Sequence, residues 1–99
     1  MNEIKVLMIE PKKEPYVTEI GDDLKSMQKA VGGYIETVPL SGTAVLVCNE
    51  EGKLLRMEVS RRLVDDILLG TFFVAGYKED EFTDLSDADI EKYTQLFKI

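Results

Sequence analysis

The sequence predicts an α+β fold for residues 1–99, in which two main helices pack on a mixed or antiparallel sheet of about four to six strands. Short runs of β-branched and aromatic residues are bounded by turn residues, which is typical of strands. Two other stretches repeat apolar residues at helical spacing. Hydrophobic residues at 44% and charged residues at 31% are ordinary for a folded protein, and the length suits a single compact domain.

The first twenty residues predict a β-hairpin. Residues 4–9 are mostly aliphatic and predict a first strand. Residues 10–15 contain two prolines among charged residues, and they therefore predict a turn. Residues 16–20 predict a short second strand that pairs with the first.

A helix is predicted to begin near Leu24 and to end at Gly32. Asp22 and Asp23 precede it, and their carboxylates can cap the first turn and favour the positive end of the helix. Gly32 can adopt the left-handed conformation that closes a helix. Residues 34–38 then predict a strand. One face of the helix is apolar and consists of Leu24, Met27, Ala30 and Val31.

The middle of the chain predicts further strands and one segment with two alternatives. Residues 43–48 form a nearly continuous apolar run, which predicts a central strand buried on both faces. Residues 49–52 predict a turn, after which residues 53–56 can return antiparallel to that strand. Residues 57–69 predict either an irregular connection or a short helix with an apolar face formed by Val59, Leu63, Val64 and Ile67.

The last third of the chain predicts a strand followed by a closing helix. Residues 70–76 are bracketed by glycines and have high β propensity, which predicts a central strand, and residues 78–81 predict a solvated turn. Ser86 is a suitable N-cap because Asp89 follows three residues later, and Leu85 can pack against the first turn. The face of this helix that is expected to lie on the sheet consists of Ile90, Tyr93, Leu96 and Phe97.

The sequence lacks several groups on which catalysis commonly depends. It contains no histidine, and histidine is the commonest general base and nitrogen ligand for zinc. No glycine-rich phosphate-binding motif is present, and the paired acids lack the spacing of a calcium loop. Cys48 ends an apolar strand without a basic neighbour, which predicts a buried, inert thiol. We therefore expect no enzymatic activity, no cofactor and no bound metal ion.

Charge and hydropathy predict a cytoplasmic protein. No apolar run is long enough to span a bilayer, and the charged N-terminal stretch does not resemble a signal peptide. The single cysteine is compatible with a reducing compartment. The net charge of −7 opposes direct binding to nucleic acid or to an anionic membrane. A monomer, or a homodimer through an exposed edge strand, is expected.

An acidic stretch near the C-terminus suggests a possible contact surface. A protein that imitates the phosphate backbone of DNA needs such a row of negative charges, and Asp80, Asp84 and Asp87 are its candidate contact residues. The alternative is a solvated turn followed by the acidic start of a helix. The stretch has no basic residue between its acids, which are Glu79, Asp80, Glu81, Asp84, Asp87, Asp89 and Glu91.

A basic cluster suggests a second candidate site. Arg61 and Arg62 can hold a phosphate or a carboxylate through forked hydrogen bonds. Tyr34 and Tyr77 are candidate stacking partners for such a ligand. Alternatively, the two arginines pair internally with Asp65 and Asp66, one helical turn away.

Four segments, in the same order, resemble those of a small protein family of unassigned function and together span most of the chain: residues 6–11, 27–36, 47–54 and 70–74. The segment 27–36 is the most specific of them. Members of that family are encoded by phages, plasmids and conjugative elements, mainly of Gram-positive bacteria. In the family an asparagine often precedes the arginine that follows the glycine turn, whereas Ser60 precedes Arg61 here. The resemblance implies a cytoplasmic accessory protein of a mobile genetic element and no known reaction.

These observations leave three hypotheses about function. The first is a non-enzymatic accessory protein of a mobile element that binds a host or element protein. The second is a protein that sequesters a small anionic ligand near the arginine pair. The third is an acidic DNA mimic that inhibits a DNA-binding enzyme.

Overall fold

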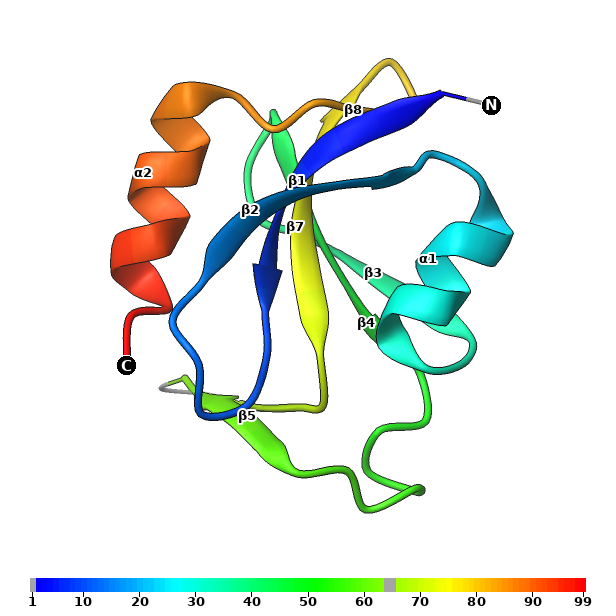
Figure 1. Ribbon diagram of the computed structural model, residues 1–99, viewed down its shortest axis with the longest axis vertical. Coiled ribbons are helices and arrows are strands. Elements are labelled where there is room, and N and C mark those ends of the chain that lie inside the picture. The colour runs from blue at the N-terminus through cyan, green and yellow to red at the C-terminus, as the bar shows by residue number, and fades with distance from the viewer. Residues whose placement is uncertain (1, 64–65) are drawn as a thin grey trace.

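The computed structural model describes residues 2–63 and 66–99 (Figure 1). All strand pairs are antiparallel, and the main sheet has the order β2-β1-β7-β4-β3, with β8 paired to β7 beside β1. A small second sheet pairs β5 with β6. The α+β prediction with two helices is confirmed. The elements are β1 (Glu3–Ile9), β2 (Tyr16–Gly21), α1 (Leu24–Val31), β3 (Ile35–Pro39), β4 (Ala44–Asn49), β5 (Val59–Arg62), β6 (Ile67–Leu69), β7 (Phe72–Lys78), β8 (Glu81–Thr83) and α2 (Asp87–Leu96).

The two helices cover opposite faces of the main sheet (Figure 1). Because side chains alternate along a strand, each central strand contributes to two cores. On the α1 face, the most buried residues are Ile4, Val6, Met8, Met27, Val31, Val45, Val47, Phe73 and Ala75. On the α2 face, they are Leu7, Ile9, Ala44, Leu46, Phe72, Val74, Leu85, Tyr93 and Phe97.

Strands β4 and β7 lie inside the sheet, as the sequence predicts. Their apolar side chains are buried on both faces, which explains why the two segments are almost continuously hydrophobic. The turn between β7 and β8 places Glu79 and Asp80 at φ 52° and 64°. Two consecutive residues with positive φ are typical of a tight hairpin turn whose twist matches the flanking strands. The predicted turn is therefore present, but the short strand β8 after it was not predicted.

Helix α1 begins and ends where the sequence predicts. The carboxylate of Asp23 accepts hydrogen bonds from the backbone N–H of Ser26 at 3.0 Å and from its hydroxyl at 2.7 Å. Gly32 closes the helix at φ 83°, and its N–H donates to the carbonyl of Gln28 at 2.8 Å. Met27 and Val31 are buried, but Leu24, the first residue of the helix, is 58% exposed although it was predicted on the apolar face.

Replacing Gly32 with alanine is expected to lower the free energy of unfolding by about 1 kcal/mol. An alanine at this positive φ must adopt a backbone conformation that its Cβ disfavours. The space itself is open, because a Cβ would lie 3.7 Å from its nearest neighbour, the methyl group of Met57. Urea titration measures the change, and a Gly32→Asn variant is expected to lose less because asparagine tolerates this conformation.

Helix α2 is capped by Ser86, whose Oγ accepts a hydrogen bond from the N–H of Asp89 at 3.2 Å. The ring of Phe97 contacts Phe72 edge-to-face, with centroids 5.2 Å apart. Leu96 was predicted on the apolar face but is 54% exposed. The helix contacts the sheet along a narrow stripe through Tyr93 and Phe97, and Leu96 lies to one side of it.

Neither helix of the described residues is long and apolar enough to cross a membrane.

Two predictions for the middle of the chain are wrong. Residues 53–56 do not form a strand but part of a series of turns. Since β4 already pairs with β7 and β3, neither of its edges is free for a returning strand. In the described part of residues 57–69, the structure has the paired strands β5 and β6 in place of a helix or an irregular connection. Val59, Leu63 and Ile67 are all partly exposed, so their helical spacing does not reflect a buried face. Val64, the fourth residue of the predicted face, lies outside the described residues.

Candidate functional site

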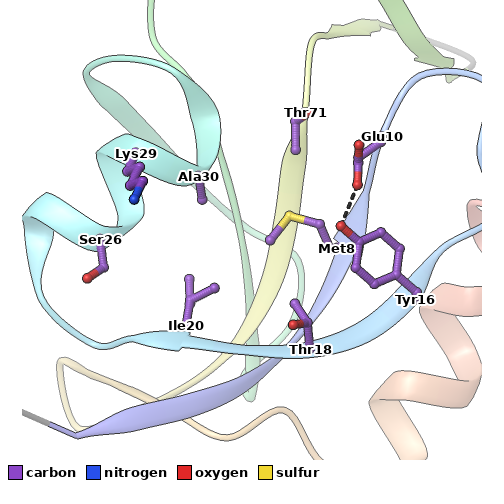
Figure 2. A pocket seen from close by; sticks show the side chains of 9 residues that line it. All are labelled: Met8, Glu10, Tyr16, Thr18, Ile20, Ser26, Lys29, Ala30 and Thr71. Atoms are coloured by element: carbon purple, nitrogen blue, oxygen red, sulfur yellow. Dashed lines mark hydrogen bonds between the residues drawn. The ribbon is translucent and has the colours of Figure 1, made fainter.

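An open cavity of about 490 Å³ lies on the α1 face of the sheet, in the part that α1 leaves uncovered (Figure 2). We call it the trough. In Figure 2, Lys29 and Ser26 of α1 stand on one side, Tyr16 and Glu10 stand on the other, and Met8 lies between them. Its volume is within the range of small-ligand and side-chain pockets. Nine residues line it: Met8, Glu10, Tyr16, Thr18, Ile20, Ser26, Lys29, Ala30 and Thr71.

The trough results from the way β2 passes into α1. The register of β1 with β2 places Thr18 and Ile20 on the same face as Val6 and Ile4. Helix α1 follows β2 after a short connection and runs toward β3 (Figure 1). It therefore covers the C-terminal end of β2, near Gly21, and leaves the N-terminal end, near Tyr16, open. The floor is therefore apolar, whereas the two walls carry polar and charged groups.

The far wall is fixed by a hydrogen bond from the hydroxyl of Tyr16 to the Oε2 atom of Glu10, drawn as a dashed line in Figure 2. The Nζ atom of Lys13 lies 3.7 Å from the other oxygen of Glu10. The hydrogen bond to Glu10, together with burial and the nearby negative charge, raises the pKa of Tyr16 to about 12. The phenol is therefore neutral at physiological pH and acts as a hydrogen-bond donor.

The ionisation of Tyr16 tests this wall. Its pKa of about 12 exceeds the ordinary 10.0, so the protonated phenol stabilises the fold below pH 10, and this contribution is lost as the pH rises through 12. The difference between the absorbance titrations of the native protein and of Tyr16→Phe gives the ionisation of this phenol alone. In Glu10→Gln, its pKa is expected to fall toward 10.0. An unchanged value would show that Glu10 does not cause the shift.

Beside the trough, β2 is an edge strand of the main sheet. The N–H of Asp22 donates to the carbonyl of Asn2 at 3.0 Å, so Asp22 directs its backbone groups toward β1. Directions alternate along an antiparallel strand, so the N–H and C=O groups of Val17 and Glu19 point away from β1, to the free edge. Residues 16–21 contain neither the lysine nor the proline that commonly protects an edge.

The arginine pair divides into a structural and an exposed residue. The guanidinium of Arg61 donates to the carbonyls of Phe97 at 2.6 Å and Ser60 at 2.7 Å, and also to those of Glu10 and Lys13. Burial lowers the pKa of Arg61, although Glu14 opposes this effect. Arg62 is exposed at the end of β5.

The internal pairing with Asp65 cannot be described, because Asp65 lies outside the described residues. Asp66, the other predicted partner of the arginines, instead lies 3.7 Å from the Nζ atom of Lys53.

The structure does not bring Tyr34 and Tyr77 to the arginines. Tyr34 is 65% exposed in the connection between α1 and β3. Tyr77 contacts Phe82 edge-to-face, and both line a separate cavity of about 350 Å³ next to β3, together with Asp80. The cavity beside Arg61 and Arg62 contains neither tyrosine among its lining residues. Stacking of a ligand between these groups and the arginines is therefore not supported by the geometry.

Three acids of the acidic stretch make internal contacts. Asp84 accepts a hydrogen bond from the backbone N–H of Lys5 at 2.7 Å, and Asp87 lies 3.5 Å from the Nζ atom of the same lysine. Asp89 accepts a hydrogen bond from the hydroxyl of Thr43 at 2.8 Å. These contacts hold the start of α2 against β1 and the loop before β4. Imitation of DNA by this stretch stays a prediction.

The half-buried Cys48 is a poor nucleophile. Burial raises the pKa of its thiol to about 11, and the negative charges of Glu36 and Asp66 contribute in the same direction. Within the described part of the chain, no group of three histidine, cysteine, aspartate or glutamate side chains is arranged to hold a metal ion. The trough itself offers apolar contacts and a few polar groups.

Residues 4–98 match the model of a protein family described as a domain of unknown function (DUF3846). The chain belongs to this family. No curated protein and no solved structure is significantly similar to the chain. The match extends over nearly the whole fold. The family has no assigned function, and the same holds for the family that the sequence resembles.

Sequence reasoning missed the trough of this DUF3846 protein altogether. Its residues come from β1 and the residue after it, from β2, from α1 and from the residue before β7, and none of these segments carries a recognisable motif. One signal was present: Tyr16, Thr18 and Ile20 alternate along the predicted second strand and therefore share a face. The position of that strand at the edge of the sheet could not be inferred from the sequence.

Proposed function

We propose that this protein is a non-enzymatic binding protein that takes up an extended segment of a partner protein along the free edge of β2. The observation that carries the proposal is the outward direction of the Val17 and Glu19 backbone groups directly beside the trough. Addition of a strand to an exposed sheet edge is a common mode of peptide recognition.

The edge and the trough supply different parts of the binding energy. Backbone hydrogen bonds to the partner strand contribute about 0.5–1.5 kcal/mol each and do not depend on its sequence. Alternate side chains of the added strand point toward the α1 face, where the trough offers the apolar surfaces of Met8, Ile20 and Ala30. Lys29 on one wall of the trough and the Tyr16–Glu10 pair on the other then favour partner segments whose side chains place polar groups beside them.

Charge favours a basic partner segment over a second copy of this chain. Glu14 precedes β2, Glu19 lies within it, and Asp22 and Asp23 follow it, with no basic residue between positions 14 and 24. Two copies paired along β2 would bring these carboxylates together, which destabilises cross-strand pairs. A segment with lysine or arginine beside apolar residues is complementary to this edge.

The biological setting of the proposal comes from the family resemblance. It implies an accessory protein of a mobile genetic element, so the partner is a host protein or a protein of the same element. Binding without catalysis is supported by the absence of histidine from the sequence and by the raised pKa of Cys48.

Selection from a library of displayed random peptides tests the proposal without knowledge of the partner. Peptides are selected on the native protein and compared on Val17→Pro, which removes an outward N–H and leaves the hydrogen bonds to β1 intact. Val17→Thr is the matched control because it keeps the N–H. We expect peptides with alternating apolar and basic residues that bind Val17→Thr normally and Val17→Pro at least about tenfold more weakly. Selected peptides that bind both variants equally would contradict the proposal.

A further inference from the structure

A second cavity, of about 420 Å³, lies at the other side of the β1–β2 turn, where β5 meets the end of the chain. We call it the β5 cavity. In Figure 1 the C-terminus, β5 and the turn after β1 lie near one another, although they are far apart in sequence. Lys12, Arg62 and Lys98 contribute positive charge to it, Val59 contributes an apolar surface, and Ser60 also lines it.

Arg61 holds the three segments of the β5 cavity together. Its guanidinium donates to carbonyls of the β1–β2 turn, of β5 itself and of Phe97 at the end of α2. Four of its five N–H groups therefore donate to the protein, while its charge remains. Because three connections converge on one rigid planar group, the walls of the cavity are fixed relative to one another.

The charge of the β5 cavity contrasts with the net charge of −7 of the protein. The neighbouring carboxylates are those of Glu58, which lies 3.1 Å from the Nζ atom of Lys12, and of Glu14, which accepts a hydrogen bond from the N–H of Ile99. Among the described residues, no carboxylate lies within 4.0 Å of the cationic groups of Arg62 or Lys98. Two exposed cations thus line a cavity beside which the side-chain carboxylates of Glu58 and Glu14 already have partners.

Ser60 provides an independent indication of a ligand. The residue is only 8% exposed, yet its Oγ atom has no hydrogen-bond partner among the described residues. A buried hydroxyl without a partner costs about 1–3 kcal/mol, so such groups are uncommon in folded proteins. An acceptor oxygen that enters the β5 cavity, which Ser60 lines, can satisfy this donor.

We propose that the β5 cavity binds a small phosphate monoester. A phosphate carries nearly two negative charges and several acceptor oxygens, which matches two convergent cations and one hydroxyl donor. The forked guanidinium of Arg62 and the ammonium of Lys98 contact the phosphate, and Ser60 donates to one of its oxygens. Val59 contacts the organic part of the ligand. This site is separate from the β2 edge and does not depend on the function proposed above.

Calorimetric titration with AMP and glycerol 3-phosphate tests the proposal, with adenosine and glycerol as uncharged controls. Binding of at least one phosphate ester, and of neither control, is expected. Arg62→Gln/Lys98→Gln is expected to weaken this binding by about tenfold or more, and Ser60→Ala by about threefold to tenfold. Lys25→Gln/Lys78→Gln removes the same charge far from the β5 cavity and is expected to bind as the native protein does.

Three results would overturn the proposal. The first is the absence of heat with both phosphate esters at millimolar concentration. The second is equal weakening by the two double variants, which would indicate a general effect of net charge. The third is tighter binding of citrate than of either ester, which would assign the β5 cavity to carboxylates. Thermal unfolding of each variant confirms that it is folded, and Arg61 is left unchanged because it supports the structure.

Discussion

Replacing Arg61 with alanine is expected to lower the free energy of unfolding by about 2–4 kcal/mol. The guanidinium donates to four backbone carbonyls, which belong to Glu10, Lys13, Ser60 and Phe97. Hydrogen bonds from a charged group contribute more than neutral ones, and three of these four bonds are partly buried. Loss of the side chain removes these hydrogen bonds and weakens the attachment of β5 to the β1–β2 turn and to the end of α2, whereas Leu68 of β6 still packs against the core on the α2 face.

Two further variants define the role of Arg61. Arg61→Lys keeps the charge but not the planar fork, so it is expected to recover less than half of the lost stability. Arg62→Ala, at the exposed neighbouring position, is expected to change stability by less than about 0.5 kcal/mol. Urea unfolding monitored by circular dichroism measures all three variants. Equal effects at Arg61 and Arg62 would refute the structural role of the former.

Gly76→Ala is expected to destabilise the protein by about 3 kcal/mol or to prevent folding. A Cβ atom at this position would lie 2.2 Å from the carbonyl oxygen and 2.8 Å from the carbonyl carbon of Asp84. Both are backbone atoms, and they cannot move freely. The N–H of Leu85 donates to the carbonyl of Lys5 at 2.9 Å, and the N–H of Lys5 donates to the carboxylate of Asp84.

Gly42→Ala is the matched control for this prediction. A Cβ at position 42 has no heavy-atom neighbour within 4 Å, and the residue lies in the loop before β4. Its effect is expected to be within about 0.5 kcal/mol in either direction. A folded Gly76→Ala with the stability of Gly42→Ala would show that the segment between β8 and α2 does not pack closely on β7.

The elements that sequence reasoning predicted well are those with local signals. Helix α1 is delimited by the side chain of Asp23 and by the backbone freedom of Gly32, both of which act within one turn. Strands β4 and β7 are recognisable because burial on both faces requires a long apolar run. Ser86 marks the start of α2 in the same local way.

The segment between residues 57 and 69 was predicted incorrectly because its structure depends on a distant contact. Val59, Leu63 and Ile67 have helical spacing, but the hairpin is attached to the main sheet through Arg61 and carbonyls up to 51 residues away. Long-range contacts of this kind override local periodicity. For the same reason, Arg61 was identified as a candidate ligand group although the structure uses it internally.

The candidate sites were predicted to different extents. The arginine cluster, with the adjacent Ser60, was found from the sequence alone, and the structure adds Lys12 and Lys98 from other segments of the chain. The trough was not found, because its existence depends on the strand order and on how much of the sheet α1 covers. Neither property follows from a single sequence. The free edge of β2 could not be predicted either, because it also depends on the strand order.

Amide hydrogen exchange, followed residue by residue by NMR, tests the proposed binding edge most directly. In the free protein, the amides of Thr18 and Ile20 are expected to exchange slowly because they donate to β1, and those of Val17 and Glu19 quickly. When a selected peptide or the partner is added, protection is expected to appear at Val17 and Glu19. Protection confined to the acidic stretch or to the β5 cavity, with fast exchange retained at Val17 and Glu19, would contradict binding along β2.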